Sequence, residues 1–312
     1  MEILSPTPDV LDRAATALRS GGVVVIPTET VYGLACNALD ADAVRRVFAI
    51  KGRPANNPLI VHVASEAQAR QVTSAWPESA TVLAARFWPG PLTMVLPRAA
   101  VVPDVTAADL DTVAVRMPAH PVALELIRRA GVPLAAPSAN PFMRLSPTRA
   151  EDVDPSIVSQ VTMVLDGGPC DVGLESTVVD LSGTAPMVLR PGGIPRAALE
   201  AALVGPWITE RTETVTRSPG MHPRHYAPRA TIRLVASTPP GAAGLVFSAP
   251  ANPQQIRMPS EPQAYGAMLY AALRRLDLLG VAEIFVVTPP SGDAWEAVHD
   301  RLRRASTALD AP

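Results

Sequence analysis

The chain has 312 residues, of which 48% are hydrophobic and 18% charged, so it can bury a core and is not a disordered chain. Its net charge of −2 and sequence pI of about 6.2 argue against a generally basic surface for nucleic acids. Its two cysteines, Cys36 and Cys170, are far apart, which argues against a disulfide scaffold, and no Cys/His cluster has zinc-site spacing. With no signal-peptide pattern at the N-terminus and no apolar run near the roughly 18 residues of a membrane span, we expect a cytoplasmic protein that does not contact a membrane.

The first 63 residues predict a helix, a strand, a second helix and a second strand. Apolar residues at helical spacing predict a helix over Pro8–Ser20, and the β-branched run Gly22–Ile26 predicts a buried strand. A polar turn follows. Asp40 is the expected N-cap of the next helix and Gly52 its C-terminal stop. Leu59–Val63 predicts another strand, so two strand ends and a helix end meet at one edge of a sheet, where ligands bind in open α/β folds.

Polar and cationic side chains crowd this predicted edge. Thr28 and Thr30 alone would be ordinary turn formers, and Lys51 and Arg53 alone would be a solvated helix end favoured by the helix dipole. A histidine within a strand, such as His62, is more often a hydrogen-bonded core residue than a ligand. Their density between rigid prolines favours a binding site over these separate readings.

The next segment predicts alternating helices and strands, and one strand ends in a cation. The predicted elements are helices over Ser65–Val72, Glu78–Phe87 and His120–Ala130, and strands over Leu92–Leu96 and Thr112–Pro118. Arg116 lies near the end of the last of these strands. A buried arginine is costly unless it is paired or meets an anion, so Arg116 is a candidate anion ligand.

Residues 133–205 complete the first predicted domain. We expect strands over Pro133–Ala136, Thr162–Leu165 and Met187–Arg190, and a helix over Pro195–Val204. Ser146-Pro147-Thr148 reads as an N-cap followed by a helix-starting proline, and such an N-terminus favours phosphate.

The remaining residues predict a linker and a second domain. Residues 206–230 are polar and rich in proline, which predicts an interdomain linker, yet they hold two histidines, a tyrosine and an arginine within five residues, unlike a passive Gly/Ser spacer. The predicted division is a domain at 1–205, a linker or lid at 206–230 and a small α/β domain at 231–312. The elements expected in that last domain are strands over Ile232–Val235, Leu245–Phe247 and Glu283–Val287, and helices over Ala264–Leu279 and Trp295–Ala305.

Several long motifs carry a family resemblance. PTETVYGL begins at Pro27 and KGRPANNPLIVH at Lys51, and FWPGPLT, VAVRMP, PSAN, GLESTVVD and LRPG follow in order. Together with SPGM and HYAP in the linker, they resemble the long two-domain form of the YrdC-like threonylcarbamoyl-AMP synthase family. In the longer members this linker lies over the active site, so the resemblance implies a lid that shields the pocket. The resemblance covers nearly the whole chain and is weakest beyond Ala230.

The resemblance implies a fold, a reaction and a set of site residues. The fold is α/β: a YrdC-like twisted mixed sheet with helices around a cationic cavity, plus a smaller C-terminal α/β (Rossmann-like) domain. The reaction joins L-threonine, bicarbonate or CO2 and ATP, carried by Mg²⁺, and supplies proteins that transfer the threonylcarbamoyl group to tRNA. The implied threonine ligands are Thr30, His62, Arg116, Ala136 and Ser176. The implied ATP ligands are Lys51, Arg53, Asn57, Thr112, Ser138, Asn140, Ser146, Arg190 and Tyr226, and no protein metal site is expected.

One position departs from the family pattern. Between PSAN and SPT the family usually has a glycine, and this chain has Met143. Glycine adopts positive φ at no cost and methionine does not, so we expect a loop of different shape or mobility near Arg144 and Ser146.

The residues themselves favour anion binding, and the resemblance leaves two other classes open. The sequence has no P-loop, no G-x-S-x-G elbow and no tight carboxylate pair. Cations and hydroxyls without a nucleophile suit nucleotidyl transfer, in which the protein mostly positions the reactants. The alternatives are an RNA-binding module making weak RNA contact, disfavoured by the acidic pI, and a carbamoyl-transfer relative acting on carbamoyl phosphate.

Overall fold

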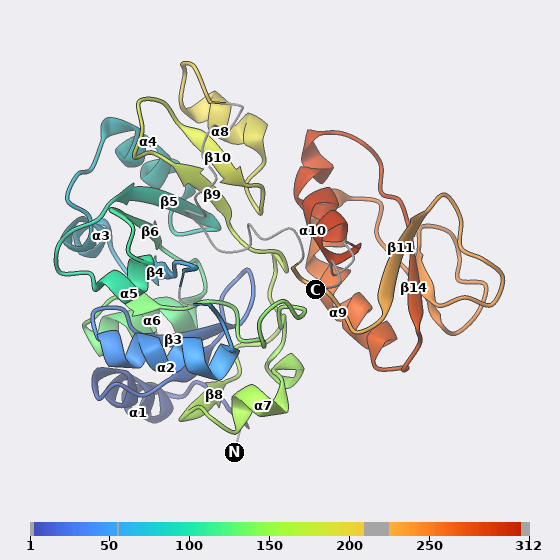
Figure 1. Cartoon of the computed structure of the whole chain (residues 1–312), viewed down its shortest axis with the longest axis horizontal. Coiled ribbons are helices and arrows are strands. Elements are labelled where there is room, and N and C mark those ends of the chain that lie inside the picture. Colours follow the sequence, from blue (N-terminus) through green and yellow to red (C-terminus); the bar gives the residue numbers. More distant parts are fainter. Residues whose placement is uncertain (1–2, 55, 209–224, 307–312) are drawn as a thin grey trace.

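The protein folds into two α/β parts, each built on its own sheet (Figure 1). The computed structural model describes residues 3–54, 56–208 and 225–306. We call residues 3–208 the larger part and residues 225–306 the smaller part. The predicted fold class, a mixed sheet with helices plus a smaller C-terminal α/β domain, is confirmed.

The larger part contains a mixed sheet. Among the described residues its strand order is β1 (Ile3–Leu4), β8 (Met163–Leu165), β2 (Val24–Ile26), β3 (Gly33–Asn37), β7 (Leu134–Ala135), β4 (Ile60–His62), β6 (Thr112–Arg116), β5 (Leu92–Pro97), β9 (Thr177–Asp180) and β10 (Met187–Arg190). β4 and β6 run parallel, with His62 paired to Arg116. β7 and β5 run antiparallel to β4 and β6 respectively.

Helices cover this sheet because its strands are apolar on both faces. Along β2, Val25 packs in one core cluster, whereas Val24 and Ile26 pack in another on the opposite face, as the two-residue period of a strand requires. The helices of the larger part are α1 (Pro8–Arg19), α2 (Ala41–Lys51), α3 (Glu66–Val72), α4 (Glu78–Phe87), α5 (Asp104–Ala107), α6 (Pro121–Ala130), α7 (Pro155–Val158) and α8 (Arg196–Ala202), with a 3₁₀ turn η1 (Ala150–Asp152).

Helix α2 places the two expected cations at the sheet edge. Asp40 caps its start by accepting from the amides of Asp42 and Ala43, and Gly52 ends it with a φ of 60°. The helix therefore stops at Lys51, and Arg53 begins the loop that leads to β4.

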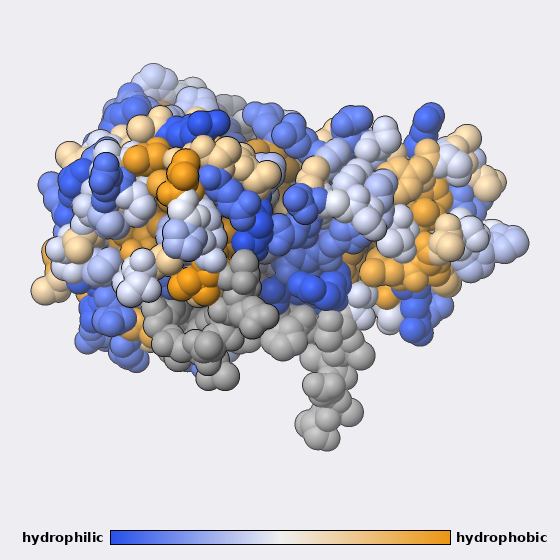
Figure 2. Space-filling view, turned by 90° about the horizontal axis from the view of Figure 1, so that it is seen from above, coloured by the Kyte–Doolittle hydropathy of each residue, from blue (hydrophilic) through white to orange (hydrophobic). Residues whose placement is uncertain are grey.

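The smaller part has a parallel sheet of four described strands, in the order β11 (Thr231–Val235), β14 (Glu283–Val287), β12 (Gly244–Val246) and β13 (Gln255–Arg257). Its other elements are α9 (Pro262–Asp277), η2 (Asp293–Trp295) and α10 (Glu296–Ser306). Figure 1 shows α9 and α10 lying between the two sheets, so these helices face the larger part. Hydrophilic residues gather where the two parts meet on the face shown in Figure 2.

The structure corrects two expectations about local structure. The segment expected to be only a polar turn between Ile26 and Asp40 contains the strand β3. The helix expected to start at Ser146 is absent from the described structure. The next helical turn along the chain is η1, which starts at Ala150. Ser146 is wholly buried, and its hydroxyl bonds a side chain instead of capping a helix. Most of the predicted linker, residues 209–224, lies outside the described residues.

Candidate active site

A pocket opens where several strands of the large sheet end. His62 is the last residue of β4 and Arg116 the last of β6, so the parallel pairing of these strands puts both side chains at one edge. Ala136 follows β7 directly and Ser176 precedes β9. All four line one pocket, at the edge where the sequence predicts a binding site.

The structure brings most predicted ligands together but not all. The five residues predicted for threonine, Thr30, His62, Arg116, Ala136 and Ser176, all line this pocket. Four of the residues predicted for ATP line it as well: Arg53, Ser138, Arg190 and Tyr226. Five do not: Lys51, Asn57, Thr112, Asn140 and Ser146. Which of the two ligands, threonine or ATP, each of these residues binds stays a prediction.

Three of the five residues outside the pocket lining lie in different places: Lys51, Asn57 and Thr112. Lys51 lies behind the wall, where its ammonium donates to the backbone carbonyls of Ser138 and Asn140. The side-chain amide of Asn57 is buried without a hydrogen-bond partner among the described residues. Thr112 begins β6, at the strand end opposite to Arg116.

At one end of the pocket Arg116 is held by three groups. We call this the threonine end, after the ligand that the sequence predicts for it, and define it by Glu29, Thr30, His62 and Arg116. Arg116 forms a 2.6 Å ion pair with Glu29, and both side chains are more than nine-tenths buried. Arg116 also donates to the Thr30 hydroxyl at 2.8 Å and to the Gly90 carbonyl at 3.2 Å. Burial opposes ionisation of Glu29, yet the charge of its ion-pair partner Arg116 holds the pKa of that carboxyl below its usual value.

His62 is neutral in this environment. Burial, together with the nearby charge of Arg116, lowers the pKa of its imidazole to about 3. Its Nδ1 lies 3.2 Å from the Ile60 carbonyl. The threonine end therefore combines one cation, one anion and a neutral imidazole.

At the other end of the pocket Arg53 and Arg190 line the wall, and Lys51 lies behind it. We call this the phosphate end and define it by Lys51, Arg53 and Arg190. Arg53 donates to the carbonyls of Asn57 at 3.2 Å and Pro58 at 3.0 Å. Burial, with the charge of Arg53, lowers the pKa of Lys51 well below its usual value. Burial, together with the charge of Arg190, lowers the pKa of Arg53 to about 9. Mutually repelling cations of this kind favour an anionic ligand.

Ser176 lies between the two ends. Its carbonyl accepts from Arg190 Nη2 at 2.9 Å, and its hydroxyl lies 3.1 Å from the same nitrogen and 2.8 Å from the Thr93 hydroxyl. Thr93 pairs with Arg116 across β5 and β6. Short contacts therefore connect the two ends, and two ligands bound there would be adjacent.

Sequence reasoning missed Glu175, which also lines the pocket. Its carboxylate accepts from the Ser146 hydroxyl at 2.7 Å and from two side chains of the smaller part, Tyr270 at 2.9 Å and Arg301 at 2.8 Å. Glu175 stands inside the GLESTVVD motif, so an acidic residue beside Ser176 was a usable signal. No local sequence motif marks its partners, Tyr270 on α9 and Arg301 on α10, because they meet Glu175 only when the two parts of the molecule pack together.

The loop that carries Met143 reaches the linker residues. Met143 takes a φ of 68°, the left-handed conformation that favours glycine, and its carbonyl accepts from the Ala227 amide at 2.9 Å. Tyr226, the neighbouring pocket residue, also has a positive φ of 60°. The loop thus holds the end of the linker against the pocket at the cost of backbone strain.

Metal ligation by protein groups has no clear candidate here. In residues 3–54, 56–208 and 225–306 no group of three or more His, Cys, Asp or Glu side chains is placed to hold a metal ion. No helix within those ranges is long and apolar enough to cross a membrane.

The chain is similar to known proteins along almost its full length. Residues 16–192 match the Sua5/YciO/YrdC family model, described as "Telomere recombination", and residues 194–307 match a model described as "Threonylcarbamoyl-AMP synthase, C-terminal domain". A threonylcarbamoyl-AMP synthase of Pyrococcus abyssi is 40% identical, with 94% of this chain and 93% of that protein covered. One of Bacillus subtilis is 38% identical, with 97% and 94% covered. The crystal structure of P. abyssi Sua5 with L-threonine superposes with a TM-score of 0.89 at 40% identity, covering 98% of this chain and 96% of that one.

Proposed function

Because this chain belongs to the Sua5/YciO/YrdC family, we propose that it is a threonylcarbamoyl-AMP synthase. It makes threonylcarbamoyl-AMP from L-threonine, bicarbonate or CO2 and ATP, releases pyrophosphate, and so serves threonylcarbamoyladenosine modification of tRNA. One observation supports this most: a pocket with a charge-balanced end and a cation-rich end, in a chain whose 40% identical relative has been solved with L-threonine. A cytoplasmic location belongs to the proposal, since ATP and tRNA are found there.

The threonine end suits an amino acid. The α-carboxylate of threonine pairs with Arg116, and the neutral His62 and the hydroxyls of Thr30 and Ser176 accept or donate hydrogen bonds to its amine and hydroxyl. Because Glu29 already balances Arg116, a zwitterion adds no net charge to this end. After the ammonium group loses a proton to solvent, the free amine condenses with bicarbonate to give N-carboxythreonine and water.

The phosphate end suits ATP. The carbamate carboxylate of N-carboxythreonine, not its α-carboxylate, attacks the α-phosphorus of ATP. The bond from that phosphorus to the oxygen bridging the α- and β-phosphates breaks, and pyrophosphate leaves as threonylcarbamoyl-AMP forms. Arg53 and Arg190 offset the negative charge on the phosphates, and Lys51 supports them from behind the wall. The protein therefore acts as a nucleotidyltransferase mainly by positioning two ligands side by side.

In this proposal Mg²⁺ is bound by the phosphate oxygens of ATP and arrives with the nucleotide. The carboxylate in the pocket wall, Glu175, already accepts hydrogen bonds from Ser146, Tyr270 and Arg301, so it is poorly placed to ligate the ion. Bound Mg²⁺ would neutralise phosphate charge and favour departure of pyrophosphate. The labile product would pass to proteins that transfer the threonylcarbamoyl group to tRNA.

The test is pyrophosphate release from ATP and Mg²⁺, with threonine and bicarbonate each supplied or omitted. We expect release only when both are present, and a slower rate with serine in place of threonine. Release from carbamoyl phosphate would instead indicate a carbamoyl-transfer enzyme. No release in any combination would contradict the proposal, and a salt-dependent RNA titration would then test a binding role.

A further inference from the structure

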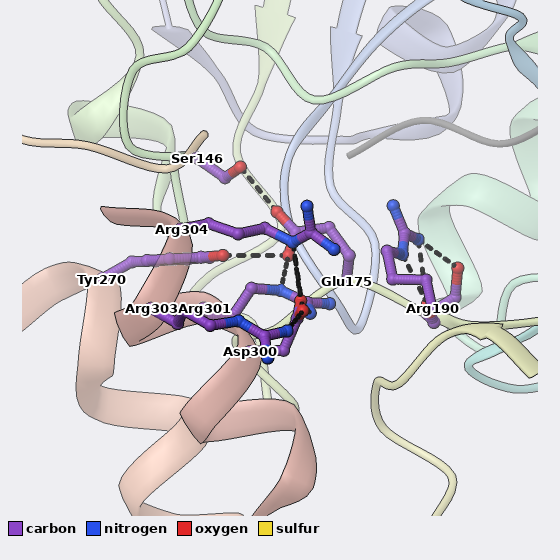
Figure 3. Close-up of polar contacts among 9 residues, drawn as sticks. Ser146, Glu175, Arg190, Tyr270, Asp300, Arg301, Arg303 and Arg304 are labelled. Atoms are coloured by element: carbon purple, nitrogen blue, oxygen red, sulfur yellow. Dashed lines mark hydrogen bonds and ion pairs between the residues drawn. The ribbon is translucent and has the colours of Figure 1, made fainter. Parts of the chain in front are cut away.

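The smaller part reaches the active site through Glu175. This residue lines the pocket, but its carboxylate is turned toward α9 and α10 (Figure 3). Tyr270 donates to Oε2 at 2.9 Å and Arg301 Nε donates to the same oxygen at 2.8 Å. The Ser146 hydroxyl donates to Oε1 at 2.7 Å. Two side chains from outside the larger part thus set the position of a pocket residue.

The two ion pairs of Arg301 are buried. The Arg301 side chain is 0% exposed, and its Nη1 forms a second ion pair with Asp300 Oδ2 at 2.8 Å. Asp300 also pairs with Arg304 at 3.1 Å and with the exposed Arg303 at 2.9 Å. A buried arginine with two carboxylate partners is a built feature, because each unpaired ion would be strongly unfavourable there.

The same two residues support a second side chain of the pocket wall. The Arg301 guanidinium lies 5.1 Å from the centre of the Tyr226 ring, within cation–π range. The Tyr270 ring stacks on Tyr226 at 5.8 Å with an interplanar angle of 29°. Tyr226 lines the pocket beside Glu175, so the smaller part backs the wall at two neighbouring points.

Arg301 also determines the charge that the pocket presents. Burial opposes ionisation of Glu175, but the charges of Arg301 and Arg190 and the hydrogen bond from Ser146 together keep its pKa below its usual value. Glu175 is therefore an anion in the wall of a pocket whose nearby cations, Arg53 and Arg190, suit phosphate. Without Arg301 the carboxyl would lose the ion pair that orients it, and any charge left on it would oppose a polyanion uncompensated, since little water is there to screen it.

We propose that Arg301 and Tyr270 are positioning residues of the active site: they neutralise and fix Glu175 and support Tyr226, so that packing of the smaller part sets the affinity for ATP. This inference rests on the proposed function. It gives α9 and α10 a role in nucleotide binding, one that acts through Glu175 and Tyr226 rather than by contact with the substrate.

Arg301→Met tests the proposal in the full-length protein. Calorimetric titration with Mg-ATP in the absence of threonine should show affinity at least about tenfold weaker than wild type. Threonine affinity should stay within about threefold, because the threonine end is held by other residues. Arg303→Met, on the same helix but in contact with Asp300 from the exposed side, is the matched control and should leave both affinities unchanged.

Two further variants separate positioning from simple loss of stability. Tyr270→Phe removes one hydroxyl and keeps the ring, and should weaken Mg-ATP by a smaller factor, about threefold to fivefold. Glu175→Gln added to Arg301→Met removes the uncompensated charge and should restore most of the Mg-ATP affinity. If Arg301→Met does not fold, the Tyr270→Phe titration decides alone.

Three results would overturn the inference: unchanged Mg-ATP affinity in the folded variant, equal losses for Mg-ATP and threonine, or no recovery in the double variant. The proposed function fails separately, if the wild-type protein shows no pyrophosphate release that needs threonine and bicarbonate. The Mg-ATP titrations would still decide the inference in that case.

Discussion

The two ends of the pocket hold their arginines in different ways. At the threonine end Arg116 pairs with Glu29 at 2.6 Å, so the end is close to charge-neutral. At the phosphate end Arg53 and Lys51 donate to backbone carbonyls, which orient a cation without cancelling its charge. A balanced end suits a zwitterionic amino acid and a cation-rich end suits a polyanion. We infer that the choice of counter-group, more than the number of arginines, sets which ligand charge each end favours.

Arg116→Ala should break the threonine end with the largest effect. Threonine loses its carboxylate partner and Glu29 is left buried without its ion pair, so threonine affinity should fall at least about 100-fold. Mg-ATP affinity should stay within about threefold. Calorimetric titration of each ligand measures both. Arg98→Ala, which removes an arginine paired to the exposed Asp104, is the control. An unchanged threonine affinity would defeat the assignment of Arg116.

Arg53→Met should give the reverse pattern. Removing one buried cation from the phosphate end should weaken Mg-ATP about 10- to 50-fold, because a charge-assisted contact to phosphate is lost. Threonine affinity should change by less than about threefold. The same titrations measure both values. Equal losses of the two ligands would mean that the ends do not act separately.

The neutral His62 should make stability depend on pH. Its pKa is about 3 in the folded protein, against 6.5 for an exposed histidine, so the unfolded chain binds a proton in that interval and the folded protein does not. Its contribution to stability is therefore complete above pH 6.5 and decreases as pH falls toward 3, by up to about 1.4 kcal/mol per pH unit. Urea unfolding between pH 7 and 4.5 should show a steeper loss for wild type than for His62→Asn. Parallel curves would show that His62 is protonated when folded.

Substitution of Met143 should have the smallest effect, which is on the free energy of unfolding, because Met143 adopts a strained backbone conformation. Glycine normally makes a folded protein less stable than alanine, but at a φ of 68° the order reverses, since a Cβ is disfavoured there. Met143→Gly should therefore be more stable than Met143→Ala by about 1 kcal/mol. Chemical unfolding of the two variants provides the comparison. Greater stability of the alanine variant would show that the loop has relaxed out of this conformation.

Local patterns predicted the elements whose signals lie within a few residues. The caps at Asp40 and Gly52 bound α2 as expected, and β14 was expected over the residues where it forms. Arg116 stood out because a strand seldom buries an arginine without a partner. The partner itself, Glu29, was passed over, because a glutamate in a polar turn gives no sign that it will be buried.

The remaining errors have a common cause, which is that tertiary contacts overrode local preference. Ser146-Pro147-Thr148 has the composition of a helix start, yet the Pro147 carbonyl accepts from the Tyr32 amide and the Thr148 carbonyl from the Cys170 amide, so these carbonyls are not used in a helix. Arg301 is one of several arginines on an amphipathic helix. Nothing local separates it from the exposed Arg303, and only the packing of α10 against the larger part does so.

The most direct test of the central claim is to identify the product made from ATP, Mg²⁺, threonine and ¹³C-bicarbonate by mass spectrometry. The account predicts an adenylate that contains threonine and one additional labelled carbon, formed together with pyrophosphate and absent when bicarbonate is withheld. A threonine adenylate without the labelled carbon would contradict it. That product would mean that the two ends of the pocket bring threonine itself, rather than its carboxylated form, to the α-phosphate.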